Sequence, residues 1–70
     1  MYLPQAGPEV KYVIVAHYTK RMYEGMGYVT LSYLMDITGL DHVEIINILY
    51  QMGFVDNPVN SNTWVLESDI

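Results

Sequence analysis

The segment at residues 41–53 constrains the fold more than any other part of this 70-residue chain. Asp41 is a favourable helix N-cap, and Glu44 three positions later completes an acidic form of the capping box. The apolar residues that follow have the i, i+3, i+4, i+7 spacing of a buried helix face: Ile45, Ile48, Leu49 and Met52. Gly53 is typical of a helix end. The segment therefore predicts a helix with one face in a core.

A shorter helix is predicted before this segment, and a hairpin after it. Thr30 is a suitable N-cap for a helix over residues 31–37, which Gly39 ends. Two short β-prone runs joined by an Asn- and Pro-rich loop predict a pair of strands: residues 54–55 and residues 63–66. We expect Trp64, in the second run, to pack across the hairpin onto the helices.

Residues 8–24 predict a first helix, because Pro8 suits an initial helical turn and Gly25 suits an end. The polar residues of this segment share one stripe: His17, Lys20, Arg21 and Glu24. Apolar residues cover most of the remaining circumference, which is more apolar surface than a helix on the outside of a domain needs. The alternative is a strand over residues 10–18, since residues 13–15 are all β-branched.

The composition indicates a domain with a small core and a tendency to associate. Apolar residues make up 51% of the chain and charged residues 16%, so the chain is expected to fold rather than remain disordered. A chain of this length buries only about 60% of the surface that its unfolded form exposes. The absence of Cys excludes disulfides and thiolate metal sites. We therefore expect self-association to add stability.

The order helix, short strand, helix, tight turn, helix, hairpin resembles the winged helix-turn-helix family. Residues 29–40 look like the short strand, second helix and turn of that family, and residues 41–55 look like its third helix and the entry into its wing. The resemblance implies a mainly α fold with three helices and a C-terminal β-hairpin wing. The expected organisation is an arm at 1–7, a winged-helix domain at 8–67 and a tail at 68–70.

Charge disfavours the role that many members of this family have. Their third helix enters the major groove of DNA, and contacts of cations with phosphate supply much of the affinity. This chain has a net charge of −5, and its cations Lys11, Lys20 and Arg21 all lie in the first predicted helix. Neither the third helix nor the hairpin contains a Lys or Arg. Protein–protein contact is therefore the leading hypothesis.

Two apolar surfaces are predicted to make these contacts. On the third helix the predicted target contacts share an outward face: Val43, Ile46, Asn47 and Tyr50. On the first helix the predicted contacts of a homodimer are Tyr12, Val15 and Tyr18. The alternative for the third helix is that its outward stripe packs inside the domain, beneath the arm that contains Tyr2 and Leu3.

Two other functions remain open. The first is a dimeric transcriptional regulator that binds a specific DNA sequence, with Lys20 and Arg21 on phosphates. The residues that would lie near bases are His42, Asn47, Asn60 and Asn62. The second is a mimic of DNA that inhibits a DNA-binding protein through its acidic residues: Asp36, Asp41, Glu44, Asp56, Glu67 and Asp69.

Catalysis and metal binding are not expected. His42 lies near Asp41 and Glu44, but side chains two positions apart on a helix point to different sides. We find no phosphate-binding loop and no catalytic triad pattern, so we expect no cofactor and no small-molecule substrate. No run of about 18 apolar residues and no signal segment is present, so we expect a cytoplasmic protein that does not enter membranes. Short chains of this type are similar to small regulators of viruses and mobile elements.

Overall fold

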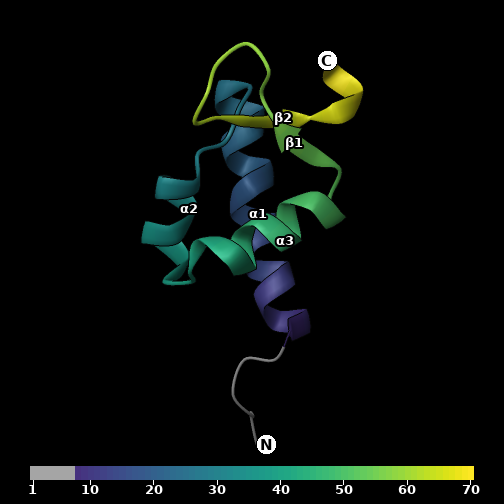
Figure 1. The fold of residues 1–70 in the computed structure, drawn as a ribbon. Helices are drawn as coiled ribbons and strands as arrows, with labels where there is room; N and C mark the ends of the chain where they lie inside the picture. The colour runs from purple at the N-terminus through teal and green to yellow at the C-terminus, as the bar shows by residue number, and fades with distance from the viewer. Residues whose placement is uncertain (1–7) are drawn as a thin grey trace, which may run out of the picture.

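Residues 8–70, the part of the chain that the computed structural model describes, form three α-helices followed by a β-hairpin (Figure 1). In chain order the elements are α1 (Pro8–Met26), α2 (Leu31–Thr38), α3 (His42–Gln51), β1 (Phe54–Asp56), β2 (Trp64–Leu66) and the short 3-10 helix η1 (Glu67–Asp69). The predicted arm at residues 1–7, with Tyr2 and Leu3, lies outside the described residues. The predicted mainly α fold with a small C-terminal wing is confirmed.

α1 is a helix along its whole length, so the alternative of a strand over residues 10–18 is wrong. The helix continues two residues beyond the predicted last residue, Glu24, and includes Gly25. It ends where Gly27 takes a left-handed φ of 80° and its N–H donates to the Tyr23 carbonyl at 2.8 Å. A left-handed residue closes the last turn, and Gly27 rather than Gly25 has that conformation.

α2 and α3 begin at the predicted N-caps. The Thr30 hydroxyl accepts a hydrogen bond from the Tyr33 N–H at 3.3 Å, and the Asp41 carboxylate accepts one from the Glu44 N–H at 3.0 Å. Gly39 ends α2 with a φ of 75° and donates its N–H to the Met35 carbonyl at 2.9 Å. These local contacts fix the turn between the two helices.

β1 and β2 form an antiparallel pair in which Phe54 lies opposite Leu66 and Asp56 lies opposite Trp64. Val29, in the connection from α1 to α2, forms a bridge with Trp64. Its N–H donates to the Trp64 carbonyl at 2.9 Å, and the Trp64 N–H donates to the Val29 carbonyl at 2.8 Å. The hairpin is therefore tied to the connection between the first two helices.

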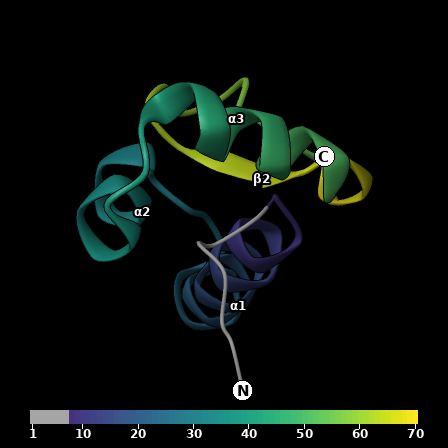
Figure 2. The ribbon, with the colours of Figure 1, turned by 90° about the horizontal axis from the view of Figure 1, so that it is seen from below.

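The core lies between α1 on one side and α2, α3 and the hairpin on the other (Figure 2). Its buried residues come from all of these elements: Val15, Val29, Leu34, Ile45, Ile48, Leu49, Phe54 and Trp64. The predicted core face of α3 is confirmed, with Met52 half-buried at its end. The layout is compatible with a winged helix. None of the described helices is both long and apolar enough to cross a bilayer.

Candidate functional site

The face of α3 that points away from the core carries polar and apolar side chains and no cation. Its exposed residues are His42, Val43, Asn47 and Tyr50. Val43 is 55% exposed and Tyr50 is 57% exposed, and both lie on this one face. Apolar residues that share an exposed face are typical of a surface that meets a partner. Ile46 is half-buried and packs against the core. The predicted stripe is therefore strongly exposed at two of its three apolar positions.

A groove of about 540 Å³ lies between the start of α2, α3 and the hairpin. It is lined by Leu31, Ser32, Ile46, Asp56, Asn62 and Trp64. The Trp64 ring packs edge-to-face with Tyr50, and their ring centres lie 5.4 Å apart. Of the lining residues Asp56 alone is charged. Three apolar residues, two neutral polar residues and one carboxylate thus line the groove, and this lining offers no cation to a phosphate group.

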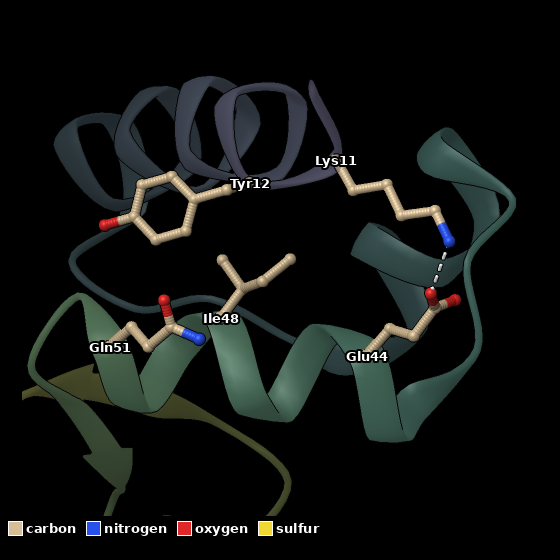
Figure 3. A pocket seen from close by; sticks show the side chains of 5 residues that line it. All are labelled: Lys11, Tyr12, Glu44, Ile48 and Gln51. Carbon is tan, nitrogen blue, oxygen red and sulfur yellow. Dashed lines mark hydrogen bonds and ion pairs between the residues drawn. The ribbon is translucent and has the colours of Figure 1, made fainter. Parts of the chain in front are cut away.

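A smaller pocket of about 230 Å³ lies between α1 and α3 (Figure 3). At one end the Lys11 ammonium lies 2.7 Å from the Glu44 carboxylate and joins the two helices by an ion pair. At the other end are the Tyr12 ring and the Gln51 amide. Tyr12, predicted as a dimer contact, is thus half-buried inside the domain between α1 and α3.

Only one half of the predicted capping box forms, because the ion pair takes up the Glu44 side chain. Asp41 caps α3 as predicted. The carboxylate of Glu44 binds Lys11 of α1 instead of returning to the backbone N–H of Asp41. A long-range cation thus replaces the local donor, which spacing within α3 could not reveal.

The other two cations, Lys20 and Arg21, are exposed side chains of α1. Lys20 lines a hollow that also includes Met52 at the end of α3 and Leu66 of β2. No residue after Arg21 is a Lys or Arg, so α2, α3 and the hairpin contribute no cation. The remaining residues of the DNA-binding alternative are all exposed, and none of them is a Lys or Arg: His42, Asn47, Asn60 and Asn62.

Several acids of the DNA-mimic alternative already have partners inside the chain. Asp41 caps α3, Glu44 pairs with Lys11, and Asp69 accepts a hydrogen bond from the Tyr23 hydroxyl at 2.5 Å. A mimic needs an array of free carboxylates, so these internal contacts weaken that hypothesis. Asp36, Asp56 and Glu67 are exposed.

The contact between Tyr23 and Asp69 fastens the end of the chain to α1. The hydrogen bond to the Asp69 carboxylate raises the pKa of the Tyr23 phenol, and burial adds to the shift. The backbone N–H of Leu66 donates to the same hydroxyl at 3.3 Å. Residues 67–69 form η1, and the contact of Asp69 with Tyr23 joins this short helix to α1.

The predicted dimer face of α1 is the face that packs inside the domain. Val15 is 0% exposed and belongs to the core, so its prediction as a dimer contact is wrong. Tyr18 is half-buried against the core and packs edge-to-face with His17 at 5.1 Å. The larger part of the apolar surface of α1 is the inner face, which packs against the core.

The sequence interpretation missed the apolar residues on the opposite face of α1. Val10, Val13 and Ile14 are exposed in the first half of this helix. A signal for them exists, because the polar stripe through His17 and Arg21 continues toward the N-terminus at helical spacing and reaches these residues. The exposed face of α1 is thus polar in its second half and apolar in its first.

Neither histidine joins a cluster of acidic side chains. His17 and His42 are both exposed, on α1 and at the start of α3. Within residues 8–70 no three His, Asp or Glu side chains are grouped as they would be around a metal ion.

Comparisons of the chain with protein-family models, with curated proteins and with solved structures give no match.

Proposed function

We propose that this chain is a winged-helix regulatory protein that binds a protein partner through the outward face of α3. The observation that carries the proposal is the distribution of charge and apolar surface on that face. Val43 and Tyr50 are more than half exposed there, and α2, α3 and the hairpin contain no Lys or Arg. Tyr with aliphatic neighbours is a common combination at protein interfaces.

The groove beside α3 supports the same proposal. The apolar residues that line it include Ile46 and Trp64, and the Tyr50 ring packs edge-to-face with the Trp64 ring. An apolar side chain of a partner could enter this groove while Val43 and Tyr50 contact the surrounding surface. Buried aromatic anchors next to a pocket are typical of the residues that dominate binding energy.

The charge distribution argues against the DNA-binding alternative. Nonspecific affinity for a duplex arises almost entirely from cations on phosphates. Lys11 is held by Glu44 between α1 and α3, while Lys20 and Arg21 lie on α1. A duplex against the outward face of α3 would therefore meet neutral and acidic side chains.

Site-specific photocrosslinking in the native cell tests the proposal. A photoreactive phenylalanine analogue in place of Tyr50 should crosslink a discrete partner, and the same analogue in place of Glu24 on α1 should not. Both positions are exposed, so the control matches the accessibility of the probe. Adding Val43→Asp to the probe variant should abolish the crosslink because it places a charge in the centre of the contact. Equal crosslinking from both positions, or none from Tyr50, would contradict the proposal.

A further inference from the structure

The exposed face of α1 combines an apolar half with charges at its ends. Val10 is 48% exposed, Val13 64% and Ile14 39%, and all three lie in the first half of the helix. Glu9 precedes them, and Arg21 follows on the same stripe in the second half. In Figure 2 α2, α3 and β2 lie to one side of α1 and leave its other side uncovered by these elements. This stripe has no role in the function proposed above.

We propose that this stripe binds the same stripe of a second copy of the chain, with the two α1 helices antiparallel. The twofold axis lies between Val13 and Ile14. Val13 of each copy then faces Ile14 of the other, and Val10 packs beside His17 of the other. The six aliphatic side chains leave water together at the centre of the contact.

Charge complementarity selects the antiparallel orientation and the second copy as occupant. A helix rises 1.5 Å per residue, so in this register Arg21 lies about 4.5 Å along the axis from Glu9 of the second copy. Lys20 of the second copy lies about 3 Å along the axis from the same Glu9, so two long cationic side chains are placed near this carboxylate. Twofold symmetry forms the ion pair at both ends. A parallel pair would instead place Arg21 beside Arg21 and Glu9 beside Glu9.

The geometry of the domain leaves room for this pairing. Val15 and Thr19 face the core from the opposite side of α1, so the rest of each domain lies outside the helix pair. The outward faces of the two α3 helices then point in opposite directions. A dimer that reads two half-sites must turn both recognition helices toward one duplex. The proposed dimer therefore presents two separate protein-binding faces.

The contact is small, with three partly exposed aliphatic side chains from each copy. Interfaces well below the usual area are weak, so we expect a reversible dimer with a dissociation constant in the micromolar range. Sedimentation velocity across micromolar concentrations should show the dimer grow with concentration. A monomer throughout that range overturns the proposal.

Variants then locate the contact. Val13→Asp should weaken the dimer at least about tenfold, because the dimer would have to bury two unpaired carboxylates. Val43→Asp, which changes another valine that is more than half exposed but lies on α3, should leave the dimer unchanged. Circular dichroism verifies that each variant is folded. A dimer that persists with Val13→Asp, or that is lost with Val43→Asp, overturns the proposal.

Charge exchange and crosslinking test the orientation even if Val13→Asp fails to fold. Glu9→Arg and Arg21→Glu should each weaken the dimer about fivefold, and the double variant should restore it.

Because the chain has no Cys, single cysteines give clean crosslinks. Val13→Cys should form a disulfide-linked dimer under mild oxidation. Glu24→Cys should not, since the antiparallel register separates the two copies of that position by about 30 Å. Absence of the charge rescue, or a Glu24→Cys crosslink as efficient as that of Val13→Cys, overturns the antiparallel pairing.

Discussion

α1 and α3 both bury one face and expose apolar residues on the other, but they are fixed in place by different kinds of contact. α3 is defined locally, by the Asp41 cap at its start and by its own regular apolar spacing. α1 is oriented by contacts far along the chain. Lys11 pairs with Glu44 over 33 positions, and Tyr23 binds Asp69 over 46 positions. The comparison teaches that local signals define the faces of α3, whereas tertiary contacts select which apolar face of α1 is buried.

The same two helices also differ in charge. α1 contains all three Lys and Arg residues of the chain, and α3 contains none. A winged-helix layout normally needs cations on and around its third helix to hold DNA. In this chain they are on the helix at the back of the domain, and this separation is the physical basis of the proposed protein-binding role.

The largest effect is expected inside α3, where the two faces can be compared directly. Leu49 is 0% exposed in the core, and Leu49→Ala should lower the free energy of unfolding by about 3 kcal/mol. Val43→Ala on the outward face should change it by less than about 0.5 kcal/mol. Urea titration followed by the fluorescence of Trp64, the single tryptophan, measures both. Equal losses from the two variants would mean that the outward face is packed inside the domain.

The local definition of α3 is tested by removing its cap. Asp41→Ala should cost about 1 kcal/mol, since the Glu44 N–H loses its acceptor at the positive end of the helix. Asp36→Ala is the matched control, because Asp36 is an exposed acid within α2 and makes no hydrogen bond among the described residues. The same urea titration applies. A loss from Asp36→Ala as large as that from Asp41→Ala would attribute the effect to net charge instead of capping.

The tertiary packing of α1 leaves one polar group unsatisfied. Thr19 is fully buried, and its hydroxyl has no hydrogen-bond partner within residues 8–70. Thr19→Val keeps the shape and removes the hydroxyl, so we expect it to raise the free energy of unfolding by about 0.5–1 kcal/mol. A fall in stability on the same titration would show that the hydroxyl has a partner after all.

The anchor at the other end of α1 should give the smallest effect and a characteristic pH dependence. Tyr23→Phe removes the hydrogen bond to Asp69 and should cost about 0.5 kcal/mol at neutral pH. The pKa of Tyr23 is raised above its ordinary value of 10.0 chiefly by that hydrogen bond. Folding therefore favours the neutral phenol, and this stability is complete below pH 10 and is lost as pH rises through the raised pKa.

Titrations at a series of alkaline pH values measure this difference. The stability of the wild-type chain should fall toward that of Tyr23→Phe above pH 10, so the gap between the two closes. A gap that stays constant across this range would show that the phenol is not held neutral by Asp69.

Much of the fold could be predicted because its determinants are local. Thr30, Gly39 and Asp41 each act on backbone groups a few residues away, and the two strands flank a loop of turn-forming residues. The outward face of α3 followed from the same periodicity. The orientation of α1 could not be predicted, because apolar residues surround most of that helix. Val15 became core and Val13 became surface through contacts with elements that come later in the chain.

A fluorescence anisotropy titration of a mixed-sequence DNA duplex at low salt tests the central claim most directly, because weak electrostatic binding is strongest there. We predict no binding at protein concentrations up to high micromolar, since the outward face of α3 and the hairpin contain no Lys or Arg. Binding that weakens steeply with added salt, and that is lost with Lys20→Ala and Arg21→Ala, would contradict the account and restore the DNA-binding function.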